Sequence, residues 1–400
     1  MMTFEDAISS LTDKNGMRLL PVLLDMRQRD DAVLIVNLAG DGQQAQISAF
    51  VADERTDEAC TGILSIAEAG SCSEVIVYCG ETSPNKLIDS LKESVSAALT
   101  VLTGPSTLVL RDETALFSVM DTGIVRVNRA EQDYASSFLS YGYHGRPTLV
   151  VDAETAYQAG RLTNNPCSGV TKLVFIIGSE AAIMEAPAGT SIAELLKDHG
   201  YKGSALIGGS CGWFVKSEAF GEVCIGFSYE YDCVCLLSDG DCAVDVLNNL
   251  YLAAKEHSCG KCVMCREGSW QLSAIFTDMS NGRSNRDDIA LIEDICPIIQ
   301  ASALCAFGRN MINPALSATT IFHEELYAHV ITRCCKAGKC AGLMKYIIDP
   351  SLCTGCGKCI DACPVEAITK DGDKCVIDPE KCVDCGACVG QCPLEAIAEK

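Results

Sequence analysis

The sequence predicts a multidomain α/β and α+β fold that ends in a small cysteine-rich domain. Three observations carry this prediction. Short apolar runs alternate with an amphipathic segment over residues 1–165, four amphipathic helices follow from residue 242, and one cysteine pattern occurs twice in the last fifty residues. A chain of 400 residues is long enough for two to four domains, each with its own core.

Charge and cysteine usage narrow the class of protein. The formal charge of -22 disfavours nucleic acid and anionic membranes as partners and favours docking to basic patches on other proteins. Many of the 26 cysteines occur in runs with ligand spacing, and the N-terminus lacks the basic and apolar regions of a signal peptide. No apolar run reaches the roughly 18 residues of a membrane helix. We therefore expect a cytoplasmic protein without bound nucleic acid or membrane insertion.

Residues 1–165 predict an α/β domain. The apolar runs at 32–36, 74–78 and 108–110 are bounded by turn residues and indicate buried strands. Residues 84–102 carry apolar side chains at helical spacing, which predicts a helix that covers the sheet. A flavin or dinucleotide phosphate needs clustered glycines, and neither G-x-G-x-x-G nor G-x-x-x-x-G-K occurs in the first 160 residues.

Residues 166–241 predict a small β-grasp module. Ser191, with Glu194 three residues later, forms a capping box and predicts the start of a helix. Several strands wrapped on one helix indicate the β-grasp arrangement. The strands are expected at the apolar runs 173–177, 205–207 and 233–237.

Residues 242–328 predict a helical bundle that carries a metal site. Four amphipathic segments form the helices, and a C-x-x-C-x-x-C run lies at the junction of the first two. Three cysteines at this spacing can wrap around a four-iron cubane, so the fourth thiolate must come from a distance. Four zinc-binding cysteines are the alternative. The expected 4Fe-4S ligands are Cys259, Cys262, Cys265 and, from the loop after the third helix, Cys305.

Residues 346–400 contain an internal duplication. A C-x-x-C-x-x-C-x-x-x-C-P run starts at Cys353 and again at Cys382. Two zinc sites are the alternative, but zinc ribbons need neither the third cysteine nor the Cys-Pro ending. The segment closely resembles the two-cluster ferredoxins, in which the fourth cysteine of each run ligates the other cluster. This resemblance implies one 4Fe-4S cluster on Cys353, Cys356, Cys359 and Cys392, and a second on Cys363, Cys382, Cys385 and Cys388.

The bundle motif resembles a known family. The run Ser-Cys-Gly-Lys-Cys-x-x-Cys-Arg-Glu-Gly at 258–268 and the run Leu-Cys-Ala-Phe-Gly at 304–308 resemble the iron-sulfur bundle of the NADH-oxidising flavoprotein subunit of respiratory complex I. They are also similar to the β subunits of electron-bifurcating iron hydrogenases and NAD-dependent formate dehydrogenases. The added two-cluster domain matches the hydrogenase branch. The resemblance implies a flavoprotein α/β domain at 1–165 and an SLBB-like β-grasp module at 166–241.

The flavoprotein-like domain departs from the pattern of that family. The glycine-rich run G-R-G-G-A-G-F-P-T-G, which holds the flavin phosphate, has no counterpart near residues 1–36. The run at 147–155 has Val151 and Asp152 where the family has two flavin-facing asparagines, and a carboxylate repels a phosphate. We therefore expect a degenerate FMN and NADH domain without bound FMN, and no catalytic residue in this chain.

A hinge at 329–345 joins the bundle to the duplicated domain. In the bifurcating relatives a histidine followed by a C-x-x-x-x-C element occupies this position, and the resemblance implies a zinc ion there. Three cysteines with one histidine form a closed tetrahedral site, and unliganded thiols are the alternative. Either Cys296 or Cys334 is available as the fourth ligand, and we select Cys296. The predicted zinc ligands are thus Cys296, His329, Cys335 and Cys340.

Together these elements predict an iron-sulfur electron-transfer subunit with three 4Fe-4S clusters, in a multi-subunit oxidoreductase of the electron-bifurcating type. Single electrons would pass between a flavin-bearing subunit, or a ferredoxin, and a catalytic subunit of the hydrogenase, formate or aldehyde class. A thioredoxin-like 2Fe-2S subunit is a further expected partner. Two alternatives stay open, an FMN-dependent NADH dehydrogenase with a diverged nucleotide site and an iron-sulfur redox sensor.

Overall fold

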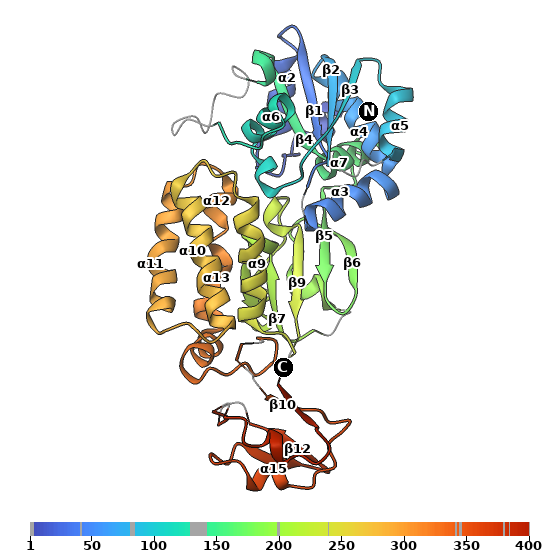
Figure 1. Ribbon diagram of the computed structural model, residues 1–400. Coiled ribbons are helices and arrows are strands. Elements are labelled where there is room, and N and C mark those ends of the chain that lie inside the picture. Colours follow the sequence, from blue (N-terminus) through green and yellow to red (C-terminus); the bar gives the residue numbers. More distant parts are fainter. Residues whose placement is uncertain are drawn as a thin grey trace. The chain divides into compact units, whose positions relative to one another are not determined.

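The computed structural model describes residues 4–40, 42–80, 85–128, 142–197, 201–238, 240–340, 342–343, 346–378, 381–383 and 385–399. The chain forms two compact units, whose helices and strands are labelled in Figure 1. The first unit comprises residues 1–237, 257–266 and 299–314, and the second comprises residues 238–256, 267–298 and 315–400. Residues 341, 344 and 345 of the expected hinge lie outside the described residues.

A four-stranded parallel sheet forms the centre of the first unit. Its order is β3-β2-β1-β4, and all three strand pairs are parallel. Every residue of β1 is buried, as expected for an aliphatic central strand covered on both faces. The predicted strands at 32–36 and 74–78 are confirmed. The strands are β1 (Ala32–Asn37), β2 (Cys72–Cys79), β3 (Ala98–Thr103) and β4 (Thr148–Asp152).

Helices pack on this sheet and on one another. α4 and α7 cross at two glycines: a Cβ added to Gly62 would lie 1.9 Å from the Ala156 carbonyl oxygen, and one added to Gly160 would lie 1.7 Å from the Glu58 carbonyl oxygen. Only glycine permits this close approach. The helices are α1 (Phe4–Ala7), α2 (Leu19–Met26), α3 (Gln43–Glu54), α4 (Thr56–Ala69), α5 (Asn85–Ser94), α6 (Glu113–Thr122) and α7 (Ala153–Asn164).

Two predicted elements of this domain were wrong. Residues 108–110 belong to a 3-10 helix, η1 (Leu108–Arg111), and not to a strand, because the Thr107 hydroxyl accepts a hydrogen bond from its first turn and caps it. The helix predicted at 84–102 ends at Ser94, and its last residues form β3. Pairing with β2 favours the extended backbone there, although the spacing of the apolar side chains also fits a helix.

A second, five-stranded sheet also belongs to the first unit. Its order is β6-β5-β9-β7-β8, with β5 and β9 parallel and the other pairs antiparallel. The short helix α8 (Ile192–Leu195) begins at the predicted cap, where the Glu194 amide donates to Ser191 Oγ at 3.1 Å. The three predicted strands are confirmed, and β6 and β8 are additional. The strands are β5 (Thr171–Ile177), β6 (Ala181–Pro187), β7 (Ser204–Ile207), β8 (Trp213–Lys216) and β9 (Cys233–Leu237).

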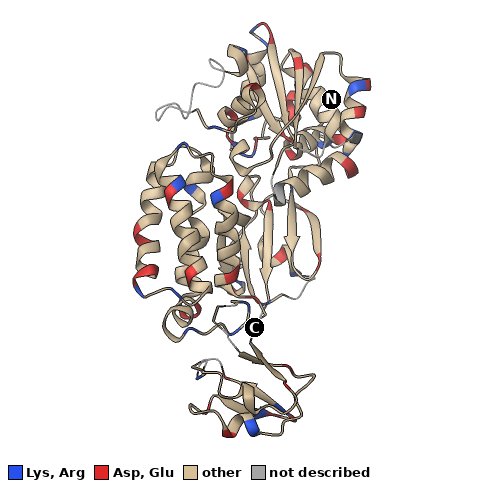
Figure 2. Cartoon of the chain, viewed as in Figure 1, with Lys and Arg blue, Asp and Glu red and all other residues tan. Residues whose placement is uncertain are grey.

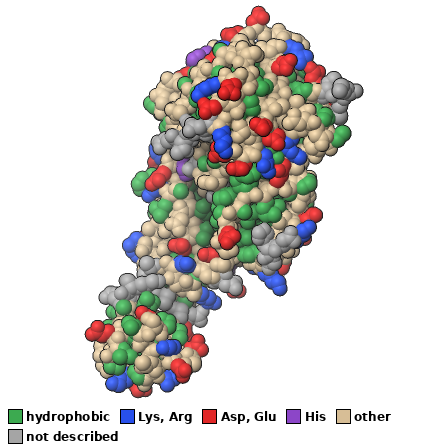
Figure 3. Space-filling model, turned by 90° about the vertical axis from the view of Figure 1, so that its right-hand side faces the viewer, with side chains coloured by type: hydrophobic (Ala, Val, Ile, Leu, Met, Phe, Trp, Pro, Cys, Tyr) green, Lys and Arg blue, Asp and Glu red, His purple; other side chains and the backbone are tan. Residues whose placement is uncertain are grey.

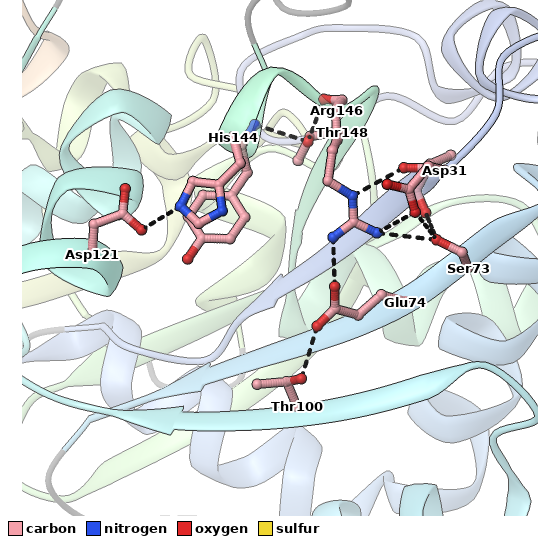
Figure 4. Close-up of polar contacts among 10 residues, drawn as sticks. Asp31, Ser73, Glu74, Thr100, Asp121, His144, Arg146 and Thr148 are labelled. Carbon is pink, nitrogen blue, oxygen red and sulfur yellow. Dashed lines mark hydrogen bonds and ion pairs between the residues drawn. The ribbon is translucent and has the colours of Figure 1, made fainter.

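Arg146 connects the N-terminal ends of the parallel strands (Figure 4). Its Nη2 donates to Asp31 Oδ1 at 2.8 Å, and its Nη1 donates to Glu74 Oε2 at 2.6 Å. Thr100 Oγ1 donates to the other carboxylate oxygen of Glu74 at 2.8 Å. The hydrogen bond from Arg146 is the largest cause that lowers the pKa of Glu74. Because ligands of open parallel sheets bind at the carboxyl ends of the strands, this network at the opposite ends serves stability.

A buried ion network adjoins the carboxyl end of β4. Lys14 Nζ lies 3.0 Å from Asp152 Oδ2, 2.7 Å from Glu154 Oε2 and 2.9 Å from Asp232 Oδ1. Lys172, which is fully buried, lies 2.7 Å from Glu154 Oε2 and also contacts Asp232. Burial would raise the pKa of Asp232, but the neighbouring cations lower it to about 2. The network therefore keeps the buried Asp232 carboxylate charged.

The helices predicted from residue 242 onward are present. In the second unit, the ring of Tyr251 stacks on Phe276 with 5.3 Å between centroids, and the Tyr251 hydroxyl accepts a hydrogen bond from the Ala315 amide at 3.2 Å. No helix among the described residues is long and apolar enough to cross a membrane. The helices are α9 (Ala243–His257), α10 (Val263–Ser280), α11 (Asp287–Ser302), α12 (Ala306–Asn310), α13 (Asn313–Ile321) and α14 (His323–Tyr327), followed by a π-helical turn (Ala328–Thr332).

The described residues of the C-terminal domain of the second unit form two small antiparallel sheets, one short α-helix and a 3-10 turn (Val389–Gln391). One sheet pairs β10 (Tyr346–Ile348) with β13 (Ile397–Glu399), and the other pairs β11 (Ile368–Asp371) with β12 (Lys374–Ile377). The helix is α15 (Lys358–Asp361). Its core consists largely of cysteines and of a few aliphatic side chains from these strands. With so little apolar core, this domain needs further cross-links to be stable.

Charged side chains are spread widely over the chain. Figure 2 shows acidic positions on helices, strands and loops of both units. On the face drawn in Figure 3, Asp and Glu side chains are interspersed with Lys and Arg. The acidic residues behind the net charge of -22 therefore form no single patch on that face. Electrostatic attraction of a basic partner would be spread over the whole face.

We predict that Lys172→Met destabilises the first unit. The substitution removes one of the buried cations from Glu154 and Asp232, and breaking a buried ion pair costs about 3–5 kcal/mol. The urea midpoint of the full chain, followed by circular dichroism, is expected to fall. Lys92→Met is the matched control, because Lys92 pairs with the exposed Asp89. Equal midpoints for the two variants would show that the network contributes no more than a surface ion pair.

Candidate metal centres

The bundle cysteine group, defined as Cys259, Cys262, Cys265 and Cys305, comes from two separate segments. The first three follow α9 and enter the first turn of α10, whereas Cys305 is the N-cap residue of α12. Cys265 and Cys305 are buried, and the other two are half-buried. Burial is the largest cause that raises the pKa of Cys305 to about 12, and the thiols of Cys265 and Cys259 add to it. The structure thus brings the distant Cys305 next to the run.

Hydrogen bonds shape the loop that carries this run. Gly260 has a φ of +76°, which favours glycine, and its carbonyl oxygen accepts a hydrogen bond from Arg266 Nη1 at 2.9 Å. The Gly260 amide donates to Ser258 Oγ at 3.4 Å, and the same hydroxyl lies 3.7 Å from Cys265 Sγ. Arg266 therefore holds the loop closed over the cysteines.

Gly308 permits the close approach of α12 to this group. A Cβ added at Gly308 would lie 3.2 Å from Cys265 Sγ and 2.8 Å from the Cβ of Ala303. Any larger residue would push α12, and with it Cys305, away from Cys265. This contact explains the glycine that ends the run at 304–308.

Cys211 lies beside the bundle cysteine group, and no ligand spacing in the sequence reveals it. It belongs to a 3-10 turn, η4 (Gly209–Cys211), between β7 and β8. Burial raises the pKa of Cys211 to about 11, Arg111 opposes this rise and the Cys305 thiol adds to it. Cys211 also lines a cavity of about 310 Å³ together with Phe307. Only the fold places this thiol close to the others.

The duplicated domain repeats its contacts to sulfur as well as its sequence. The fourth cysteine of each run accepts a hydrogen bond from an amide four residues later. The Ala367 amide donates to Cys363 Sγ at 3.2 Å, and the Ala396 amide donates to Cys392 Sγ at 3.3 Å. Amide donors of this kind stabilise thiolate ligands and raise the reduction potential of the cluster they hold.

The last cysteine of each run lies beside cysteines of the other run. One cavity is lined by three cysteines of the first run and by the last cysteine of the second, namely Cys353, Cys356, Cys359 and Cys392. In the other half of the domain, burial raises the pKa of Cys388, and the thiols of Cys385 and Cys363 add to this rise. Cys382 packs on the same core. Cys375, which belongs to neither run, also lines the first cavity.

A third group of donors, the histidine-cysteine group, consists of Cys242, His329, Cys335 and Cys340. All four residues are buried, and their ligand atoms lie within 4.8 Å of one another. Cys242 Sγ lies 3.3 Å from His329 Nε2 and 3.6 Å from Cys340 Sγ, and Cys340 Sγ lies 3.4 Å from His329 Nε2. Four donors thus meet at one point inside the second unit.

Hydrogen bonds and charge prepare this group for a cation. His329 Nδ1 is 2.8 Å from the Glu325 carbonyl oxygen and donates to it, which leaves Nε2 free to bind. Side-chain hydrogen bonds hold the pKa of the Cys335 thiol well below its usual range. The larger contribution comes from the Cys242 thiol and the next from the Cys340 thiol. The edges of a zinc tetrahedron with Zn–S of about 2.3 Å and Zn–N of about 2.0 Å are about 3.5–3.8 Å. The three separations among Cys242, His329 and Cys340 come within about 0.2 Å of these edges.

The structure does not place Cys296, the selected fourth ligand, in this group. Cys296 is fully buried inside α11, and Cys242, just before α9, takes the fourth position. Cys334 is buried next to Cys335 and is also outside the group. The choice of Cys296 is thereby corrected. Cys242 has no ligand spacing in the sequence, because it lies 87 residues before His329 and only the helical topology joins the two.

Two family models match this chain. Residues 245–329 match the NADH-ubiquinone oxidoreductase-F iron-sulfur binding region, and residues 345–393 match the 4Fe-4S dicluster domain. The first match contains the whole bundle cysteine group, and the second contains both duplicated runs. The expected resemblance of these two regions is confirmed.

Known relatives agree with these matches. The chain is 30% identical over 295 residues to the NADP-reducing hydrogenase subunit HndC of Solidesulfovibrio fructosivorans, covering 66% of this chain and 59% of the relative. It is 33% identical over 95 residues to an NADH-quinone oxidoreductase subunit of Mycobacterium tuberculosis, covering 24% of this chain and 21% of the relative. The chain therefore spans less than two thirds of the length of these relatives.

A solved structure shares the fold. An NAD+-reducing NiFe hydrogenase in the H2-reduced state superposes with a TM-score of 0.72 and 18% sequence identity. The match covers 82% of this chain and 62% of that chain. At this identity the likeness establishes the architecture and nothing about the ligands.

We predict that Cys305→Ser removes about four irons per chain, the content of one 4Fe-4S cluster, because the bundle run then lacks its fourth thiolate. Iron and sulfide analysis of the anaerobically purified full chain measures this loss. Cys211→Ser is the matched control, since Cys211 is buried beside Cys305 but lies outside the run. Full iron content in the Cys305 variant, or an equal loss in the control, would contradict the ligand set.

We also predict that Cys242→Ala lowers the zinc content of the chain without lowering its iron content. The change removes one of four donors from a closed tetrahedral site. Elemental analysis after dialysis against a chelator provides the measurement. Cys296→Ala is the control, because Cys296 is equally buried but lies outside the group. Zinc lost from the control and kept by the Cys242 variant would restore the original choice of ligand.

Proposed function

We propose that this chain is an iron-sulfur subunit of an oxidoreductase and works as a relay for single electrons, as its similarity to NADH-quinone oxidoreductase subunits and to the NADP-reducing hydrogenase subunit HndC supports. It carries three 4Fe-4S clusters, one in the bundle and two in the dicluster domain. Electrons pass between a flavin-bearing subunit, or a ferredoxin, and a catalytic subunit of the same complex. The complex belongs in the reducing cytoplasm, where its thiols persist.

The observation that carries this proposal is the exchange of cysteines in the dicluster domain. Cys392 of the second run lines the cavity formed by the first run, and Cys363 of the first run lies near Cys385 and Cys388 of the second. Each set then supplies four thiolates, as a four-iron cluster requires. A bound cluster supplies one-electron chemistry. The residues of the chain hold it, donate hydrogen bonds to its thiolates and shield it from water.

The domain boundaries of the proposal follow the two sheets and the bundle. We assign residues 1–165 as a degenerate FMN and NADH domain, residues 166–241 as a β-grasp module and residues 242–328 as the bundle. The five-stranded sheet with one short helix supports the β-grasp assignment. We assign residues 329–345 as the hinge and residues 346–400 as the ferredoxin domain.

We assign the histidine-cysteine group as a structural zinc site. Its four protein donors fill a tetrahedron and leave no position for a substrate, which is typical of structural zinc. The hinge has little core of its own, but it packs closely on the bundle. A Cβ added to Gly342 would lie 2.4 Å from Asn281 Cα. Zinc would join the start of α9 to the hinge and so stabilise this contact.

The ion network at β4 supports a scaffold role for the first domain. Asp152, which stands where the resembling family has a flavin-facing asparagine, caps α7 by accepting a hydrogen bond from the Thr155 amide at 2.9 Å. Its other carboxylate oxygen is bound to Lys14. Both oxygens therefore serve the fold, and a carboxylate at this place repels a flavin phosphate.

A second candidate function is an FMN-dependent NADH dehydrogenase, and a cavity in the first unit favours it. This cavity has a volume of about 460 Å³ and is lined by Asn15, Arg111, Glu113 and Cys305. Its contact with Cys305 places any ligand beside the bundle cysteine group. Gly40 and Gly42 also lie in the turn between β1 and α3. A flavin bound here would make the first domain catalytic.

Metal and flavin content of the anaerobically purified full chain separates the two functions. The relay predicts about twelve irons with matching sulfide, and no FMN. Dithionite should bleach the visible absorbance of the chain, whereas NADH should bleach it only after a flavin-bearing NADH dehydrogenase is added. Stoichiometric FMN with bleaching by NADH alone would establish the second function in place of the relay.

A further inference from the structure

Among its described residues, the dicluster domain departs from its internal repeat at a core position. Cys353 corresponds to Cys382, so that Tyr346, which lies seven residues before the first run, corresponds to Cys375, which lies seven residues before the second run. The strand pairing agrees with this correspondence. Cys375 of β12 pairs with Lys370, and Tyr346 of β10 pairs with Glu399 at the equivalent place. A thiol therefore replaces an aromatic ring in an otherwise repeated structure.

Cys375 lies among the cysteines of the first run. It is 4% exposed and lines the same cavity as Cys353, Cys356, Cys359 and Cys392. Its amide lies 3.4 Å from Cys353 Sγ and donates to it. Its thiol shares that cavity with the sulfurs of Cys353 and Cys359, donating toward Cys353 and accepting from the Cys359 thiol. Cys375 is thus a fifth cysteine in a set that needs only four ligands.

Tyr346 has a different surrounding. Its hydroxyl lies against the loop of the second run, where a Cβ added at Gly386 would approach it to 2.8 Å. The ring covers the loop that carries Cys385 and Cys388. At the second cluster site, the Tyr346 ring thus takes the place that the Cys375 thiol has at the first.

We propose that Cys375 is a positioning residue whose thiol donates a hydrogen bond to the ligand Cys353. It thereby raises the reduction potential of the cluster on Cys353, Cys356, Cys359 and Cys392, the first-half cluster, above that of its partner. This inference rests on the proposed presence of both clusters. Hydrogen bonds to cysteine sulfur favour the reduced, more negative cluster. One electron enters the cluster, and the thiol keeps its proton, so no proton is transferred.

The test is a redox titration of the full chain under argon, followed by electron paramagnetic resonance. Cys375→Ala should lower the potential of one ferredoxin-domain cluster, and thus reduce its equilibrium constant for reduction about three- to tenfold. A tenfold change is 59 mV for a one-electron couple. Cys375→Ser keeps a donor and should restore the potential. The bundle cluster should not change in either variant.

Tyr346→Phe is the matched control in the other half, and it should leave the first-half potential unchanged. Pulsed resonance in H2O and D2O should show an exchangeable proton coupled to the reduced first-half cluster, and Cys375→Ala should lose that proton. If the alanine variant fails to retain its irons, Cys375→Val fills the space without a donor and takes its place in the titration.

Three results would overturn the inference. The first is an unchanged potential in the alanine or valine variant. The second is an equal shift in the serine and alanine variants, which would indicate packing and not hydrogen bonding. The third is loss of about four irons from all three variants, which would make Cys375 a ligand. If the unmodified chain holds no iron in its dicluster domain, the proposed relay itself fails, and iron analysis shows this before any titration.

Discussion

In the proposed function, the need to surround each metal with four donors brings distant segments of this chain together. One short loop can supply three thiolates, so each group must take its remaining ligand from a distant segment. Cys305 reaches the bundle run from the loop after α11, and Cys363 and Cys392 cross between the halves of the dicluster domain. Cys242 meets His329 across 87 residues. Because such sites do not exist in the unfolded chain, metal binding would contribute directly to the folding free energy.

The same constraint explains which ligand residues could be predicted from the sequence and which could not. The runs at Cys259, Cys353 and Cys382 were visible because their spacing encodes local loop geometry. Cys242 was missed because its partners are joined by helical topology and not by spacing. In the first domain, the predicted strands of the central sheet were found where burial is continuous. The helix predicted at 84–102 and the strand at 108–110 were wrong because strand pairing and a Thr107 cap override short apolar patterns.

The interior charges of the first domain serve its packing. Asp152, Glu154 and Asp232 form a buried network with Lys14 and Lys172, and every one of these residues has a partner within the fold. Buried charges of this kind bring little net stability, although removing one partner is costly. The network therefore preserves the packing of α7 against both sheets.

The duplication produces two similar cluster sites. If their reduction potentials were equal, an electron would favour neither cluster. Two equal potentials would share an electron evenly between the halves of the domain. One core difference, a thiol at Cys375 against a ring at Tyr346, is enough to break that symmetry, because potentials respond to hydrogen bonds at sulfur. The backbone donors to Cys363 and Cys392 are matched in the two halves, so they cancel. The direction of electron transfer between the two clusters therefore depends on side chains that differ between the two repeats.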